Sequence, residues 1–213
     1  TAAAVTVESG SLAKLLSACV FPAGLSMVIL AGSELFTGNC LMVMALLERR
    51  ITPAQLLRNW LTVYLGNAMG GAAVAALAVY SHTASLFGDG LARSMVSIAE
   101  SKAALGAGDA FLRGVLCNFL VCLAVWMAAA SKRAEGKVIA LFFPILLFVL
   151  CGYEHCIANL YYLPAGAFAA AEYGMETTLT LAGCLKNLAS VTLGNLVGGA
   201  ALGVGYRFAY LKE

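Results

Sequence analysis

The sequence predicts an all-α membrane protein built as an inverted repeat of three spans, with two broken helices. Of its 213 residues, 62% are hydrophobic and 11% are charged, which is typical of a polytopic membrane protein and not of a soluble domain. Two apolar segments are too long for simple spans and carry polar interruptions. A motif from the first half recurs in the second. Together these observations place the expected fold among membrane channels and transporters.

The two long segments run over residues 12–47 and 138–171. A straight helix of that length would measure roughly 50 Å, whereas the hydrocarbon core of a bilayer is about 30 Å thick. Polar residues interrupt the first segment at 32–39 and the second at 152–159, so we expect each helix to break there. Broken helices at matching positions of two halves are a sequence indication of a substrate path.

Five membrane elements are expected, and the basic residues orient them. The elements are 12–47 (broken), 54–80, 110–131, 138–171 (broken) and 178–210. Basic residues gather after the first and third elements and at the end of the chain: Arg49, Arg50, Arg58, Lys132, Arg133, Lys137, Arg207 and Lys212. The alternate loops are mixed or acidic. The positive-inside rule therefore predicts a cytoplasmic C-terminus and an external residue 1.

The repeat is carried by residues 59–71 and 187–199, which share Asn, Val, Leu, Gly, Asn, Gly and Gly at an offset of 128. Upstream, Glu34 and Asn39 correspond to Glu154 and Asn159 at an offset of 120. We expect one domain over 1–213, with repeat one at 1–80, an external connection at 81–109 containing an amphipathic helix, and repeat two at 110–213. The first repeat lacks a counterpart of span 110–131. Thr1–Gly10 resembles the tail of such a span, so a first span is expected to be missing from this chain.

His155 is the histidine expected inside a membrane element, at the second break. An ionisable group at membrane depth is a candidate for function by default, and the alternative is a neutral ring that holds the broken backbone together. The acidic and amide pairs of the repeat, Glu34, Asn39, Glu154 and Asn159, are interpreted as acceptors and donors for backbone freed by the breaks. A cation or proton site is the alternative for the two glutamates.

Glycines at helical spacing, Gly66, Gly70, Gly194 and Gly198 among them, predict close helix packing. Spacing alone leaves Asn67, Asn118 and Asn195 ambiguous between helix contact and pore, and it makes Lys102 an ordinary solvated lysine. The seven cysteines show no CxxC or Cys/His metal spacing, and neither a phosphate loop nor an HExxH motif is present. We therefore expect no enzyme activity, cofactor, metal or nucleic-acid partner. An intramembrane enzyme using Glu154 and His155 is the remote alternative.

Several long motifs resemble the formate/nitrite transporter family. They are Phe21-Pro-Ala-Gly-Leu, Ala31-Gly-Ser-Glu-Leu-Phe-Thr-Gly-Asn, Asn59-Trp, Leu65-Gly-Asn, the run from Gly114 to Ala128, Gly152-Tyr-Glu-His-Cys-Ile-Ala-Asn and Val191-Thr-Leu-Gly-Asn. The resemblance covers essentially the whole chain. It implies an aquaporin-like protomer with its own pore, a homopentamer in the inner membrane, and passage of small monovalent anions such as formate, nitrite or hydrosulfide.

The resemblance also implies site residues. His155 matches the central pore histidine and Thr37 the threonine that faces it. The apolar constrictions are matched by Phe21, Leu25, Leu35 and Phe148. Lys102 matches a lysine that adds external positive potential, and Asn118 and Asn195 match polar residues near the histidine.

The expected mechanism follows from the cost of moving a bare charge through an apolar constriction, which a neutral acid avoids. His155 is expected to donate or share a proton with the entering anion. Three alternatives stay open: a hydrosulfide channel, plain conduction of the charged anion, and a channel for neutral solutes.

Overall fold

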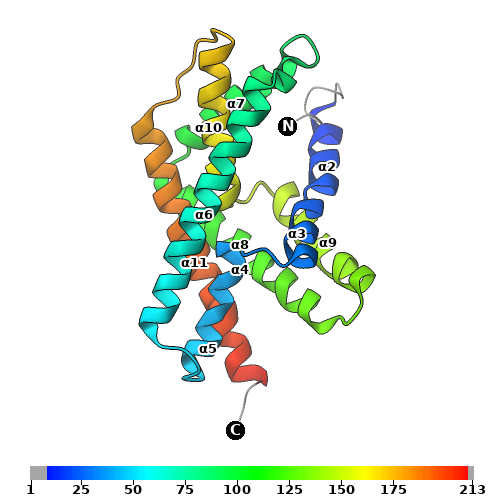
Figure 1. The fold of residues 1–213 in the computed structure, drawn as a ribbon, viewed down its shortest axis with the longest axis vertical. Coiled ribbons are helices and arrows are strands. Elements are labelled where there is room, and N and C mark those ends of the chain that lie inside the picture. Colours follow the sequence, from blue (N-terminus) through cyan, green and yellow to red (C-terminus); the bar gives the residue numbers. More distant parts are fainter. Residues whose placement is uncertain (1–8, 211–213) are drawn as a thin grey trace.

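A computed structural model describes residues 9–210, and every regular element in that part of the chain is helical. Residues 1–8, which make up most of the expected tail of a first span, lie outside the described residues, as does Lys212. The long helices run roughly parallel to the longest axis, and the C-terminal end of α11 lies at the opposite end from α7 (Figure 1). The elements in chain order are α2 (Gly10–Val20), α3 (Pro22–Ala31), α4 (Phe36–Asn39), η1 (Cys40–Met42), α5 (Val43–Leu47), α6 (Pro53–Tyr80), η2 (Thr83–Ser85), α7 (Gly90–Ala104), α8 (Ala107–Ala130), α9 (Ala134–Leu150), α10 (Cys156–Glu172) and α11 (Leu181–Tyr210).

Both expected helix breaks are confirmed, and both use the same backbone device. Gly32 follows α3 with φ of 73°, and Gly152 follows α9 with φ of 70°. This left-handed conformation ends a helix and favours glycine because it has no Cβ. The chain then runs extended for a few residues before α4 and α10 begin at Phe36 and Cys156. Each glycine thus precedes its new helix by four positions, as the repeat requires.

Four continuous helical stretches are long and apolar enough to cross a membrane: Gly10–Ala31, Pro53–Tyr80, Ala107–Ala130 and Leu181–Tyr210. α2 and α3 form the first of these as one rod that is interrupted at Phe21, since Pro22 stands at a first helical position where its missing N–H costs nothing. Large apolar side chains cover the outer surface, with Met69 74% and Leu181 75% exposed. Such a surface fits lipid contact, where water is absent.

α7 forms the amphipathic helix expected in the connection between the halves. Its apolar face, which includes Met95, Val96 and Ala99, is buried against α10. Gly166 of α10 permits this approach, because a Cβ there would lie 2.3 Å from the Ala99 side chain. The contact holds the C-terminal end of α7, and with it Lys102, beside the second break.

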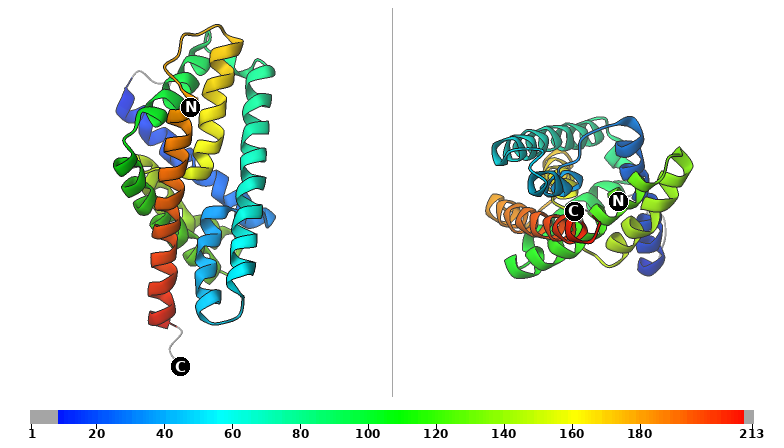
Figure 2. Two further views of the ribbon diagram at one scale, coloured as in Figure 1. Left: turned by 90° about the vertical axis from the view of Figure 1, so that its left-hand side faces the viewer. Right: turned by 90° about the horizontal axis from the view of Figure 1, so that it is seen from below.

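The glycine motif packs α11 tightly against α8. A Cβ on Gly194 would lie 2.2 Å from the Phe111 carbonyl oxygen, and one on Gly198 would lie 2.1 Å from the Val115 carbonyl oxygen. The predicted close packing is therefore present in the second half. The equivalent residues of α6, Gly66 and Gly70, have open space at the Cβ position. In the view from below, α2, α3 and α9 lie apart from α6 and α11 (Figure 2).

Candidate functional site

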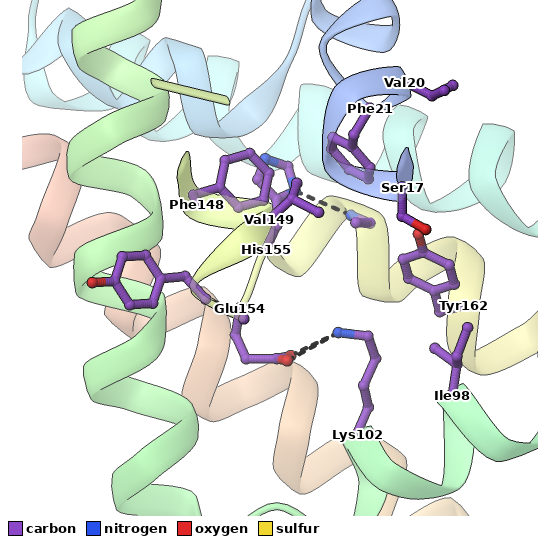
Figure 3. A pocket seen from close by; sticks show the side chains of 13 residues that line it. Ser17, Val20, Phe21, Ile98, Lys102, Phe148, Val149, Glu154, His155 and Tyr162 are labelled. Carbon is purple, nitrogen blue, oxygen red and sulfur yellow. Dashed lines mark hydrogen bonds and ion pairs between the residues drawn. The ribbon is translucent and has the colours of Figure 1, made fainter. Parts of the chain in front are cut away.

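A cavity of about 450 Å³ lies between α2, α7 and the second helix break, and we call it the vestibule (Figure 3). Its wall combines one lysine, one glutamate and one histidine with mainly apolar side chains. The residues that line it are Ser17, Val20, Phe21, Ile98, Lys102, Phe148, Val149, Gly152, Tyr153, Glu154, His155, Ala158 and Tyr162. His155 therefore forms part of the vestibule wall.

A second cavity of about 230 Å³, the lower cavity, adjoins it and is lined almost entirely by apolar residues of α3, α8, α9 and α10. Leu25 and Leu35 belong to this lining. Four residues line both cavities: Phe21, Phe148, His155 and Ala158. We call these four residues the junction.

Two aromatic contacts fix the shape of the junction. The rings of Phe21 and Phe148 meet edge to face with centroids 5.4 Å apart, and the Phe148 ring stacks on His155 with centroids 5.9 Å apart. The edge-to-face arrangement is favoured by the charge distribution of aromatic rings. Because Phe21 comes from the α2–α3 rod and Phe148 from α9, the junction closes between separate elements. The imidazole of His155 therefore lies where the linings of the two cavities meet.

His155 is held at both ring nitrogens. Its Nδ1 accepts the backbone N–H of Ala158 at 3.1 Å, so the residue caps the N-terminus of α10. A neutral ring that accepts at Nδ1 carries its hydrogen on Nε2. Nε2 lies 3.0 Å from the Thr37 hydroxyl oxygen, to which it therefore donates. The two broken segments thus meet through this hydrogen bond. His155 as a residue is 8% exposed and forms part of the vestibule wall.

Asn195 on α11 satisfies the backbone at the second break. Its side-chain oxygen accepts the Cys156 N–H at 2.8 Å, and its amide donates to the carbonyls of Gly114 at 2.8 Å and Glu154 at 3.0 Å. Asn67 on α6 does the same at the first break, accepting from Phe36 N–H at 3.1 Å and donating to the Glu34 carbonyl at 3.1 Å. These bonds replace the helical partners that each break removes.

The acidic residues of the repeat are likewise built into mirrored clusters. Asn159 donates to the Glu154 carboxylate at 2.7 Å and to the Asn187 side-chain oxygen at 2.8 Å. In the first half, Asn39 donates to the Glu34 carboxylate and, at 2.9 Å, to the Asn59 side-chain oxygen. The four side chains therefore bond to one another and to Asn59 and Asn187, whereas the backbone groups freed by the breaks bond to Asn67 and Asn195.

Lys102 turns the second cluster into part of the vestibule wall. Its ammonium group lies 3.0 Å and 3.1 Å from the two oxygens of Glu154, and both side chains are largely buried. The Tyr162 ring centroid lies 5.4 Å from the same nitrogen, and Asn187 donates to the Lys102 carbonyl at 2.8 Å. Spacing gave no signal for this ion pair, because its partners stand 52 positions apart, one on α7 and the other in the break between α9 and α10.

The remaining expected site residues lie outside the two cavity linings. Asn118 is fully buried and donates to the carbonyls of Thr37 at 3.2 Å and Asn195 at 2.7 Å. Thr37 is also fully buried and reaches the site through His155. Sequence reasoning missed Ser17 and Tyr162 as lining residues. Ser17 carries a usable signal, because it lies one turn before Phe21 on the same face of one rod.

Comparison with known proteins gives one consistent result. The family described as formate/nitrite transporter matches residues 1–209. A probable formate transporter from Methanothermobacter thermautotrophicus is 39% identical, and the match covers 95% of this chain and 77% of the relative. The formate channel FocA of Haemophilus influenzae is 38% identical, with 92% of this chain and 74% of the relative covered.

Solved structures give the same fold. A pentameric formate channel with formate bound superposes with a TM-score of 0.84 at 31% identity, covering 98% of this chain and 87% of that one. An ion channel of the same family gives a TM-score of 0.86 at 33% identity, covering 96% and 80% of the two chains. This chain therefore belongs to the formate/nitrite transporter family.

Proposed function

We propose that this chain forms a channel for small monovalent anions of weak acids, with formate or nitrite favoured over hydrosulfide. The proposal places it in the inner membrane as a homopentamer with a cytoplasmic C-terminus. Membership of a transporter family, a formate-bound pentameric neighbour and formate channel relatives support the substrate class and the assembly. The basic residues of the sequence support the orientation.

The observation that carries the proposal is the junction. One polar residue, His155, stands with two phenylalanines and an alanine where two cavities meet. An enzyme site would need a nucleophile, a metal or an acid–base pair aimed at one substrate position. A narrow apolar passage with one hydrogen-bond donor instead suits a small solute that moves through.

The proposed path begins in the vestibule. Lys102 offers an ammonium group that an entering anion can share with Glu154, and α10 presents its positive N-terminal end at His155. The anion then replaces Thr37 as the acceptor of the Nε2 hydrogen of His155. Leu25 and Leu35 surround the exit through the lower cavity. A bare charge in this apolar surrounding is strongly disfavoured, so a proton shared with the anion would lower the barrier.

Proton transfer sets a structural requirement. If Nε2 gives its hydrogen to the anion, Nδ1 must take up a proton from the aqueous solution that enters the vestibule, so that the ring stays neutral. Nδ1 is then a donor and no longer accepts the Ala158 N–H. The proposed relay therefore includes a moment at which the cap of α10 is released.

The bond between Nδ1 and Ala158 also favours a second candidate, plain anion conduction. In that case His155 stays neutral, keeps its cap and supplies only a hydrogen bond to a charged ion. Electrical recording in planar bilayers separates the two, because passage of a neutral acid carries no net current. Osmotic swelling in glycerol tests the remaining alternative, a channel for neutral solutes.

His155→Asn tests the role of the imidazole without removing the helix cap, since asparagine caps helix N-termini well and does not titrate near neutral pH. Stopped-flow flux of formate, nitrite and hydrosulfide would be measured in proteoliposomes between pH 5 and 8. Proton sharing predicts that the variant loses the pH dependence of the parent. An identical pH profile in the two proteins rejects proton sharing, and absence of flux of all three anions in the parent rejects the proposed function.

A further inference from the structure

A second lysine lies beside a residue of the vestibule lining. Lys14 lies on α2, two turns before Phe21, and its ammonium nitrogen lies 3.7 Å from the position that a Cβ on Gly152 would take. Gly152 itself lines the vestibule. The Lys14 side chain therefore reaches the segment that leads into the second helix break.

Lys14 belongs to one face of the α2–α3 rod. Positions 14, 17, 21 and 25 follow helical spacing, so their side chains share that face. Ser17 lines the vestibule, Phe21 the junction and Leu25 the lower cavity. The face that borders the proposed path from end to end thus begins with a cation. Lys14 is exposed, so its charge is solvated without a desolvation penalty.

The charges already assigned to the vestibule cancel. The ammonium of Lys102 contacts both oxygens of Glu154, so the pair contributes little net potential to an ion at some distance. Within residues 9–210, the ion pairs are Lys102–Glu154, Arg133–Glu135 and Arg207–Glu48, and none of them involves Lys14. The sign of the net electrostatic potential in the vestibule then depends on the charge of Lys14, next to Gly152.

We propose that Lys14 is a second cationic residue of the vestibule, whose charge gives the vestibule its net attraction for small monovalent anions. The assignment rests on the proposed function only for the identity of the anion. In water, a unit charge changes the concentration of a monovalent ion at a separation of about 7 Å from it about threefold. Such an effect raises the apparent affinity for the entering anion and weakens as salt screens it.

The test measures the potential directly, independently of transport. Ser17→Cys places a thiol in the vestibule wall, and Ser replaces Cys19, Cys151 and Cys184, the cysteines that are not buried. The thiol is modified in proteoliposomes with a negatively charged and, separately, a positively charged methanethiosulfonate, and the two rates are compared. Lys14→Gln should slow modification by the negative reagent about threefold and speed modification by the positive reagent about threefold. The ratio of the negative-reagent rate to the positive-reagent rate should therefore fall about tenfold.

Lys186→Gln is the matched control, because Lys186 is an exposed lysine on α11 that lines a different cavity. An unchanged ratio in Lys14→Gln, or an equal fall in Lys186→Gln, overturns the proposal. Formate flux is measured in the same vesicles. Normal flux with an unchanged ratio refutes the assignment of Lys14 alone, whereas a changed ratio without flux in the parent refutes the proposed function alone.

Discussion

The imidazole of His155 uses its two nitrogens for different purposes. Nδ1 caps α10, and Nε2 presents a hydrogen to Thr37 at the junction. Sequence reasoning identified the residue, because a histidine in a break of an apolar segment is unusual. It weighed a pore role against a backbone role, and the structure shows that the residue caps α10 through Nδ1 and also lines both cavities. That outcome depends on the ring's orientation, which no residue pattern encodes.

The side chain of Thr37 should matter through its hydroxyl. Thr37→Val keeps the shape and removes the acceptor of the Nε2 hydrogen, so the imidazole loses the partner that the anion is proposed to replace. We expect formate flux to change by about tenfold, the effect of one hydrogen bond of about 1.4 kcal/mol. Thr192→Val is the control, because the Thr192 hydroxyl is hydrogen-bonded to Tyr64 on another face of the protein. Equal fluxes in parent and Thr37→Val would contradict a role for this contact.

The Lys102–Glu154 pair should be strongly coupled in stability. Lys102→Met leaves a buried carboxylate without its cation, which typically costs about 3–5 kcal/mol. We therefore expect Tm in detergent to fall by roughly 10 °C, and the double variant with Glu154→Gln to recover most of that loss.

Arg133→Met provides the comparison, because its pair with Glu135 is solvent exposed and contributes at most about 1 kcal/mol. If the double variant were as unstable as Lys102→Met, the buried pair would not be the cause of the loss.

At the scale of elements, the helix breaks were the most predictable feature. Segment length against bilayer thickness required them, and Gly32 and Gly152 mark them in the sequence. The glycine motif was less informative, because it predicted contact but not which helix makes it. Gly198 touches α8, whereas the equivalent Gly70 has open space in the described part of the chain. Identical sequence motifs thus take different roles according to what packs on them.

Gly198→Ala should destabilise the α8–α11 contact. The added methyl would overlap the Val115 carbonyl oxygen, and backbone can yield only by moving the helix. Overpacking of this kind costs about 1–3 kcal/mol. Gly205→Ala on the same helix has open space and should gain up to about 1 kcal/mol from helix propensity. Thermal unfolding of both variants in detergent gives the comparison, and equal Tm values would contradict the packing described.

Glu100 fastens α7 to the connection between α10 and α11, outside the membrane-spanning helices. The Thr178 N–H at 2.6 Å and the Thr177 hydroxyl at 2.9 Å lower the pKa of its carboxyl. A lowered folded-state pKa contributes stability above the unfolded value, and that stability is lost as pH falls through the folded value.

Proteolysis of the connection over residues 173–180 should therefore accelerate on acidification below about pH 4.5, the ordinary value for the group. Glu100→Gln should remove this pH dependence, and Glu176→Gln is the matched control. If proteolysis of Glu100→Gln accelerated equally on acidification, the pH dependence would come from another titrating group.

At the scale of the whole molecule, the sequence predicted the repeat, the helical class and the family. It did not predict how α7 carries Lys102 to Glu154, because the fold brings distant segments together there. The proposed orientation is testable at this scale. A green fluorescent protein fused after residue 213 should fluoresce, and alkaline phosphatase inserted in the connection near residue 82 should be active. Activity in the reverse pattern would contradict the cytoplasmic C-terminus.

The central claim is that the vestibule and the lower cavity form one path through the junction, and Ala158→Phe tests it most directly. Ala158 lines both cavities, so a phenylalanine there fills the junction while leaving His155 in place. Ala167→Phe, at an exposed position of the same helix, is the control. In proteoliposomes, stopped-flow formate flux should be lost in Ala158→Phe and retained in Ala167→Phe. Undiminished flux in a correctly folded Ala158→Phe would show that the ion takes another route.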